Sequence, residues 1–280
     1  MTVNEIYQSG LKLLENNNIE NSKFETLSLL QKAFSLDRVG FIIHKTDKAD
    51  ENCSHNFLNF IEKRISGEPL QYILGEWSFM GFDFKVGRGV LIPRDDTEVV
   101  VNLCIDFLKN RADKKTVDLC SGSGAIAVAL DKISGAEVTA VEIDETAFSY
   151  LETNVKENNS SVKPVIADAL KICDTFADGG LDLIVSNPPY IKSADIETLQ
   201  KEVQLEPRLA LDGGEDGCDF YREIVSRWSR KLKKGGALAF ELGEGQADAV
   251  KTLMTEQGFS DFKISLDFGG VQRAIIGTLL

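Results

Sequence analysis

After Pro93 the sequence alternates between short apolar runs and longer amphipathic segments, and this alternation restricts the fold more than any other feature. Strands that alternate with helices pack into a mostly parallel sheet with right-handed crossover connections. We therefore expect an α/β domain built on such a sheet. The strands are expected at 115–119, 137–142, 163–167, 181–185 and 236–241, and the helices at 97–109, 124–133, 145–157, 215–232 and 244–257.

The last part of the sequence breaks this alternation. Two strand-like runs, 260–266 and 271–279, follow each other with no helical segment between them, so we expect them to form an antiparallel pair. The stretch 191–214 shows no clear periodicity and is expected to be a long loop. Long loops on a rigid scaffold often carry function.

The first part of the sequence shows helical patterns only. Apolar residues recur at helical spacing through residues 1–66, and Asn21 or Ser22 is suited to cap one of the helices. On the first helix, one apolar face is expected to consist of Ile6, Gly10, Leu13 and Leu14.

A break and a change of composition separate this helical part from the α/β part. Gly67-Glu68-Pro69 interrupts the helical pattern, and the aromatic and β-branched residues of 72–90 predict a short hairpin. We expect three parts: a helical domain over 1–70, a β-hairpin linker over 71–95 and the α/β domain over 96–280.

Composition excludes several classes of protein. The five cysteines are scattered without a Cys-x-x-Cys pair, which argues against a disulfide framework or zinc site and for the reducing cytoplasm. No apolar run approaches the roughly 18 residues of a membrane span. The net charge of −13 and the lack of a Lys/Arg cluster argue against direct binding of nucleic acid, whose phosphates attract basic surfaces. No metal site is expected.

The tetrapeptide Asn187-Pro188-Pro189-Tyr190 directly follows an apolar run, so it lies at the carboxyl end of an expected buried strand. Open α/β sheets bind their ligands at that edge. The prolines fix two φ angles and remove two backbone donors, which leaves the Asn187 side-chain oxygen and the Pro188 carbonyl as acceptors. These two acceptors suit the two hydrogens of a planar –NH2 group, with Tyr190 against its face. A plain turn is the alternative interpretation, because Asn-Pro often opens turns.

A glycine-rich loop, Asp118-Leu119-Cys120-Ser121-Gly122-Ser123-Gly124, joins the first strand of the sheet to its helix. Glycines let a ligand approach the backbone, and the helix N-terminus favours anionic groups. Glu142 ends the next strand, where its carboxylate can accept hydrogen bonds from ribose hydroxyls. This pattern also satisfies the dinucleotide fingerprint, so the loop alone leaves nicotinamide and S-adenosylmethionine both open.

Two carboxylates favour S-adenosylmethionine over a nicotinamide. Asp118 can face the cationic amino-acid moiety, and Asp168, after the third strand, can accept from the exocyclic amine of adenine. The expected cofactor-binding residues are Asp118, Cys120, Ser121, Gly122, Ser123, Gly124, Glu142, Asp168, Ala169 and Asn187.

Taken together, the motifs resemble those of the protein-(glutamine-N(5)) methyltransferases, which modify the Gly-Gly-Gln loop of peptide chain release factors. The resemblance covers nearly the whole chain. Cys120 stands where that family more often has glycine, and Glu142 where aspartate is usual. The matching segments are 67–75 (GEPLQYILG), 91–98 (LIPRDDTE), 118–124, 187–190, 206–214 (EPRLALDGG) and 216–222 (DGCDFYR).

The resemblance implies a Rossmann-like, S-adenosylmethionine-dependent methyltransferase with a substrate-recognising helical domain. It would methylate the side-chain amide nitrogen of the loop glutamine in a protein that acts in translation termination. The enzyme would be a cytoplasmic monomer. Asn187, Pro188 and Tyr190 would be catalytic, and with Pro189 they would bind the substrate. Arg94 would either brace the linker by pairing with Glu98 or another acid, or contact the substrate.

Three other functions are compatible with parts of this pattern. A nucleic-acid methyltransferase acting on adenine or guanine would meet a similar planar –NH2 group on a flipped base. A nicotinamide dehydrogenase would leave the Asn-Pro-Pro-Tyr corner unexplained. A degenerate domain that serves only as a binding scaffold is disfavoured, because the cofactor and acceptor motifs are both complete.

Overall fold

A computed structural model describes residues 1–280 and shows two compact units. One unit comprises Met1–Glu76 and Gln200–Leu205, and the other comprises Trp77–Leu199 and Glu206–Leu280. The segment Gln200–Leu205 thus packs with the helical unit, although it lies within the range 96–280 expected for the α/β domain.

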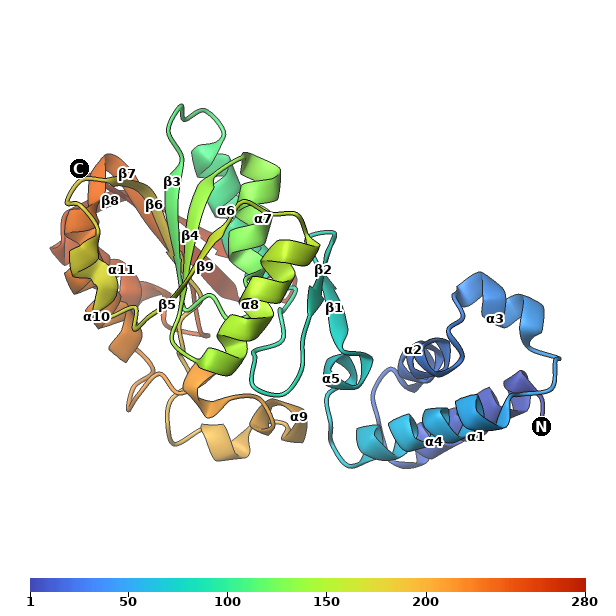
Figure 1. Ribbon diagram of the computed structural model, residues 1–280. Helices are drawn as coiled ribbons and strands as arrows, with labels where there is room; N and C mark the ends of the chain where they lie inside the picture. Colours follow the sequence, from blue (N-terminus) through green and yellow to red (C-terminus); the bar gives the residue numbers. More distant parts are fainter. The chain divides into compact units, whose positions relative to one another are not determined.

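The helical unit is built around a small apolar core. Gly10 allows α1 to approach α4, because a Cβ at this position would lie 2.4 Å from the ring of Phe57. Leu11 is buried and Leu13 is 40% exposed, so the expectation that Leu13 lies on the buried face was wrong. The helices are α1 (Val3–Asn16), α2 (Ser22–Phe34), α3 (Arg38–His44), α4 (Glu51–Ile65) and α5 (Leu70–Leu74) (Figure 1).

Helix α2 begins at Ser22, but without the expected side-chain cap. Asn21 precedes the helix in the left-handed conformation and makes no capping hydrogen bond. The Ser22 hydroxyl instead bonds backward to the carbonyl of Ile19. The start of this helix was therefore predicted correctly, and the means of capping was not.

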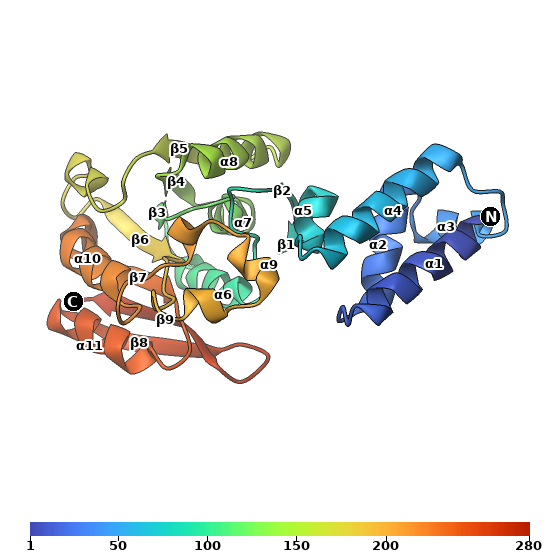
Figure 2. The same ribbon diagram turned by 90° about the horizontal axis from the view of Figure 1, so that it is seen from below.

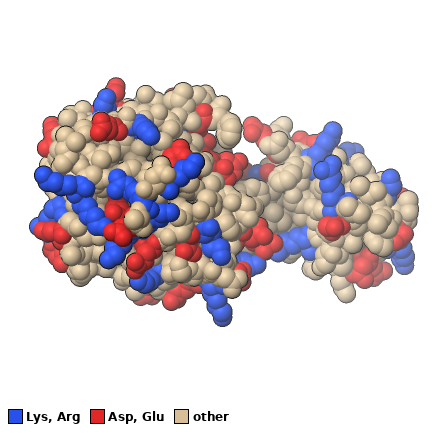
Figure 3. Space-filling model, turned by 90° about the horizontal axis from the view of Figure 1, so that it is seen from above, with Lys and Arg blue, Asp and Glu red and all other residues tan.

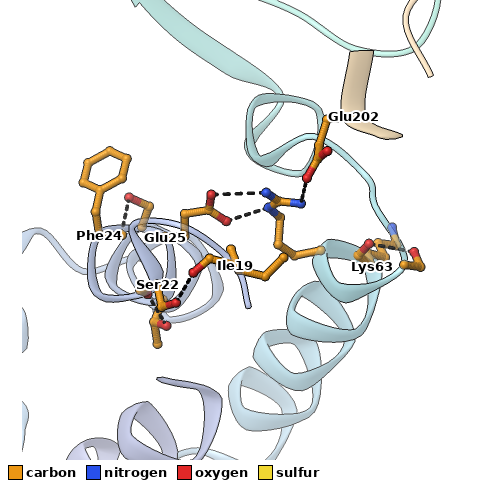
Figure 4. Close-up of polar contacts among 10 residues, drawn as sticks. Ile19, Ser22, Phe24, Glu25, Lys63 and Glu202 are labelled. Atoms are coloured by element: carbon orange, nitrogen blue, oxygen red, sulfur yellow. Dashed lines mark hydrogen bonds and ion pairs between the residues drawn. The ribbon is translucent and has the colours of Figure 1, made fainter. Parts of the chain in front are cut away.

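A buried arginine joins three segments of the helical unit. The Nε atom of Arg64 on α4 donates to Oε2 of Glu25 on α2 at 2.6 Å. Its Nη1 atom donates to Oε1 of Glu202 at 2.8 Å. Figure 4 shows the two carboxylates reaching the guanidinium from different sides. Glu202 lies on the short helix α9 (Lys201–Gln204), which is thereby attached to α2 and α4.

The expected hairpin is present, and in the sequence it follows the helices and precedes the large sheet. Strands β1 (Glu76–Phe79) and β2 (Phe82–Lys85) pair through a two-residue turn. Met80 and Gly81 both have positive φ, at 51° and 81°, as the tightest hairpin turns require.

The second unit contains a seven-stranded sheet with the order β5-β4-β3-β6-β7-β9-β8. The pairs β3–β4, β4–β5, β3–β6 and β6–β7 are parallel, whereas β9 is antiparallel to both β7 and β8. The predicted sheet and its antiparallel end are confirmed. The strands are β3 (Lys115–Leu119), β4 (Glu137–Glu142), β5 (Lys163–Ile166), β6 (Leu181–Ser186), β7 (Leu232–Glu241), β8 (Phe259–Leu266) and β9 (Gln272–Leu279).

Helices cover both faces of this sheet and form one apolar core on each face. Side chains alternate between the two cores, so Val138 and Ala140 lie in one, and Val117 and Leu119 in the other. Figures 1 and 2 show α6 and α7 on one side and α10 and α11 on the other. The covering helices are α6 (Thr97–Leu108), α7 (Ala125–Ser134) and α8 (Glu145–Glu157) on the first face, and α10 (Asp219–Trp228) and α11 (Ala247–Glu256) on the second.

Two expectations about the α/β unit were partly wrong. The helix expected at 215–232 begins only at Asp219, because Asp216 accepts a hydrogen bond from the Cys218 amide and Gly217 takes a positive φ of 78°. The stretch 191–214 is no plain loop, since it contains α9 and the 3₁₀ turns Ile196–Thr198 and Arg208–Ala210.

None of the helices combines the length and apolar character that a membrane span requires.

Candidate active site

The sheet order places a crevice at the carboxyl ends of β3 and β6. From β3 the sheet continues to β4 and β5 on one side, and to β6 and β7 on the other. Such a switch point is where open α/β sheets bind ligands. A cleft enclosing about 930 Å³, including space open to solvent, lies there. Of the expected site residues, those that line it are Cys120, Ser121, Gly122, Ser123, Glu142, Ala169, Asn187 and Pro189.

The glycine loop leaves β3 through a series of left-handed residues. Cys120, Gly122 and Gly124 have φ values of 59°, 54° and 83°. This geometry gives a physical reason for a glycine preference at position 120, because a side chain there strains the backbone. At Gly124 a Cβ would also lie 2.5 Å from Cδ1 of Leu151 on α8, so a side chain there would strain the backbone and displace that leucine.

Glu142 holds this loop in place. Its Oε2 atom accepts the backbone N–H of Gly122 at 2.8 Å. Its Oε1 atom accepts the N–H groups of Ile143 and Asp144 at 2.8 and 2.9 Å. A carboxylate offers about four lone-pair positions, so Glu142 keeps capacity for a further donor in the cleft.

Asp118 lies deeper than the sequence suggested. It is fully buried on the face of the sheet that α6 covers, and neither carboxyl oxygen has a hydrogen-bond partner. Burial, reinforced by the negative charge of Glu142, raises the pKa of Asp118 to about 7, although Ser121 and the backbone N–H of Ala127 lie near enough to oppose the shift without reaching hydrogen-bond geometry. It is not among the residues that line the cleft. An unpartnered carboxylate under the loop fits a site that receives a cation or an amino group.

Asp168 also lies outside the cleft lining, although its neighbours Ala167 and Ala169 belong to it. Its carboxylate pairs with Lys171 at 2.9 Å and accepts the N–H of Leu170 at 2.9 Å. Partial burial opposes these contacts, but together they lower the pKa of Asp168, which keeps it ionised.

The Asn187–Tyr190 corner directly follows β6, as expected. Asn187 Nδ2 donates to the Thr97 hydroxyl at 3.4 Å, so the amide oxygen is the free end of that side chain. The Tyr190 hydroxyl donates to Oε1 of Glu241 at 3.1 Å, and Gln246 Nε2 donates to the Tyr190 carbonyl at 3.0 Å. Asn187 and Pro189 line the cleft, whereas Pro188 and Tyr190 do not.

Thr97, Glu241 and Gln246 are site residues that the sequence reasoning missed. A signal for Glu241 was available, because it ends the strand predicted at 236–241 just as Glu142 ends an earlier one. Thr97 was noted only as part of a motif. Gln246 gave no signal, because it lies in the turn before α11.

Arg94 pairs with Glu206, whose other oxygen accepts the N–H of Ile92 at 3.1 Å. Of the two roles left open for Arg94, the structure shows bracing, although the partner is not Glu98, which instead accepts the N–H of Met80. Ile92 lines the cleft, as do the residues that follow Glu206, namely Pro207, Leu209 and Ala210. This ion pair therefore fixes two adjoining parts of the cleft wall.

The sheet and its cleft are Rossmann-like, and the comparisons with known proteins give the class as a methyltransferase. The crystal structure of a methyltransferase from Pyrococcus furiosus has the same fold, with a TM-score of 0.53, 22% identity, and coverage of 72% of this chain and 90% of that one. Residues 94–215 match the family described as methyltransferase small domain, and residues 5–75 match the PrmC N-terminal domain.

Relatives over nearly the full length define the particular family. The release factor glutamine methyltransferase of Geobacter sulfurreducens is 40% identical over 93% of this chain and 91% of its own length. That of Clostridium acetobutylicum is 32% identical over 99% of this chain and 98% of its own. The chain belongs to the release factor glutamine methyltransferase family, and the predicted resemblance is confirmed.

Proposed function

We propose that this protein transfers a methyl group from S-adenosylmethionine to the side-chain amide nitrogen of the glutamine in the Gly-Gly-Gln motif of peptide chain release factors. The observation that carries the proposal is the orientation of Asn187. Because its nitrogen donates to Thr97, its oxygen remains as an acceptor beside the cleft. An acceptor pair formed with the Pro188 carbonyl matches the two hydrogens of a primary amide.

The cofactor would occupy the cleft along the glycine loop. Cys120, Ser121, Gly122 and Ser123 would surround it, and Glu142 would accept from its ribose. Asp118, whose carboxyl lacks a partner, would interact with the cationic amino-acid end. When bound, S-adenosylmethionine supplies an electrophilic methyl group on a sulfonium.

The chain's own contribution to the reaction is mainly alignment. An amide nitrogen is a poor nucleophile because its lone pair is delocalised into the carbonyl. Asn187 and the Pro188 carbonyl would accept both amide hydrogens and direct the nitrogen toward the methyl group, and alignment of this kind lowers barriers by roughly 7–11 kcal/mol. These hydrogen bonds strengthen as positive charge develops on the nitrogen, so they favour the transition state. The proton would then leave to water.

The helical part would recognise the release factor. In this proposal, residues 1–70 bind the protein substrate away from its loop, 71–95 form the linker and 96–280 perform the transfer, in a cytoplasmic monomer. The helical unit supplies an apolar surface for such a role, because Val39, Ile42 and Ile43 on α3 are each more than half exposed.

Charge disfavours the alternative of a nucleic-acid substrate. The net charge is −13, and phosphate backbones are bound by basic surfaces. Figure 3 shows that the lysine and arginine side chains on the face it draws have acidic side chains among and around them. On that face several basic side chains adjoin one another over the larger unit, with acidic side chains between them.

The test is methyl transfer from labelled S-adenosylmethionine to a purified release factor, with its loop glutamine intact or replaced by alanine. Duplex DNA and ribosomal RNA serve as parallel substrates. We expect label only on the factor with the intact glutamine. Label on nucleic acid alone would keep the methyltransferase and overturn its substrate.

A further inference from the structure

A buried carboxyl lies behind the acceptor corner, and no step proposed above uses it. Glu241 ends β7, is only 2% exposed, and accepts the Tyr190 hydroxyl at 3.1 Å through Oε1. Its Oε2 atom has no hydrogen-bond partner. The Thr97 hydroxyl interacts with the same carboxyl and lowers its pKa, without reaching full hydrogen-bond geometry.

The hydrogen bonds in this cluster can be assigned donors and acceptors in only one consistent way. An amide nitrogen is a donor only, so the Thr97 oxygen accepts from Asn187 and the Thr97 hydrogen is free to turn toward Glu241. The Tyr190 hydroxyl donates to the same carboxyl from the other side. Glu241 therefore accepts from the Tyr190 end of the Asn187–Tyr190 corner, and the Thr97 hydroxyl that accepts from Asn187 interacts with the same carboxyl.

The burial of this group is energetically unfavourable. Burial raises the pKa of Glu241 despite the nearby Thr97 hydroxyl, the hydrogen bond from Tyr190 and the nearby positive charge of Arg273. Arg273 is itself engaged by Asp267 at 3.0 Å and by the Leu242 carbonyl at 2.9 Å. A buried carboxylate without full pairing carries a desolvation cost, so fold stability alone gives no reason for a carboxyl here.

We propose that Glu241 is a positioning residue for methyl transfer, which fixes the Tyr190 side chain directly and the Asn187 amide through Thr97. As a consequence, the Asn187 oxygen faces the cleft, and the Tyr190 side chain keeps a fixed position relative to that oxygen. The proposal rests on the proposed function, because the corner it positions is the one assigned to the substrate glutamine.

The first test is Glu241→Gln, assayed with the wild-type release factor as substrate. A glutamine has a similar shape, but it carries an NH2 donor in place of one carboxylate oxygen, so one of the two acceptor atoms that Glu241 offers to Tyr190 and Thr97 is lost. We expect kcat to fall by about 10- to 100-fold, the range in which small misplacements act. The Kd for S-adenosylmethionine, measured by calorimetry, should stay unchanged, and the Tm should stay the same or rise. A lower Tm with wild-type kcat would overturn the proposal and leave Glu241 a structural role.

A double-mutant cycle with Tyr190→Phe tests the link itself. Because the phenol acts through Glu241, the losses in kcat of the two single variants should not add in the double variant. Fully additive losses would contradict the proposal. The matched control is Glu137→Gln, an exposed glutamate at the start of β4 that pairs only with Lys163 on the surface, and it should behave as wild type.

A second variant keeps the proposal testable if Glu241→Gln fails to fold. Thr97→Val removes the hydroxyl and preserves shape, so the Asn187 amide loses its fixed orientation and kcat should fall. Wild-type kcat in both Thr97→Val and Tyr190→Phe would overturn the proposal. A wild-type protein that fails to methylate the loop glutamine would instead refute the proposed function.

Discussion

The carboxylate of Glu142 accepts the backbone N–H of Gly122 at 2.8 Å, across 20 residues of sequence. The residue expected to bind the cofactor ribose therefore also fixes the loop that would surround the cofactor. The same carboxylate accepts the N–H groups of Ile143 and Asp144, which turn the chain away from β4. The proposed cofactor binding and the order of the loop thus depend on one buried side chain.

Glu142→Ala should weaken S-adenosylmethionine binding by about 10- to 100-fold, the size expected when hydrogen bonds to a charged group are lost. The loss combines the missing ribose acceptor with a loop whose Gly122 amide has no partner. Isothermal titration calorimetry measures it. Glu152→Ala, an exposed glutamate on α8, is the control and should bind normally. Equal affinities of the two variants would contradict both roles of Glu142.

Much of the sheet could be predicted from the sequence, because a buried strand is a local signal. The runs 115–119 and 137–142 were predicted with their observed bounds. Each is a short apolar run with a clear end, and the residue after each end falls at the ligand edge of the sheet. For this reason the glycine loop and the Asn187 corner were found from the sequence.

What could not be predicted depends on contacts between distant segments. Thr97 meets Asn187 and Glu241 only because α6 packs beside β7 and β6 lies next to β7, and periodicity does not specify that arrangement. Likewise, nothing in the local sequence of 191–214 shows that Glu202 pairs with Arg64 or that Glu206 pairs with Arg94.

Asn187→Ala should fold and bind cofactor, but lose methyl transfer by at least ~100-fold, as for other positioned polar groups at reaction centres. The alanine removes the acceptor that orients the substrate amide and leaves the rest of the cleft intact. Single-turnover methylation of a release factor measures the effect, and calorimetry with S-adenosylmethionine is the control. Near-normal turnover would refute the orienting role.

Asp118→Asn should change how stability depends on pH. Burial raises the pKa of Asp118 from 3.8 to about 7 in the folded protein, so the folded state favours the neutral carboxyl. Its stabilising contribution is present below the unfolded pKa and is lost as the pH rises through about 7. The asparagine variant avoids this loss, so its advantage should grow from pH 5 to pH 8 and reach about 4 kcal/mol at most.

Urea denaturation of the unliganded protein at several pH values measures this advantage. The difference between the two proteins cancels the contributions of all other groups. If the difference in free energy of unfolding between wild type and Asp118→Asn does not depend on pH, Asp118 has the same pKa in the folded and the unfolded state. Adding S-adenosylmethionine should reduce the gap at pH 8, because the cofactor's cationic end would compensate the ionised carboxylate of the wild type.

Arg64→Leu should destabilise the helical unit by about 3–5 kcal/mol, the cost of leaving a buried charge without its partner. The abandoned charge is Glu25, whose side chain is only 12% exposed. Adding Glu25→Leu should recover most of the loss, because the pair is then replaced by apolar side chains. Glu202→Gln should cost less, since its side chain is 33% exposed and water can solvate it. Thermal unfolding of the full chain measures all three variants. A single Arg64→Leu variant as stable as the wild type would mean that the guanidinium does not hold α9 to α2 and α4.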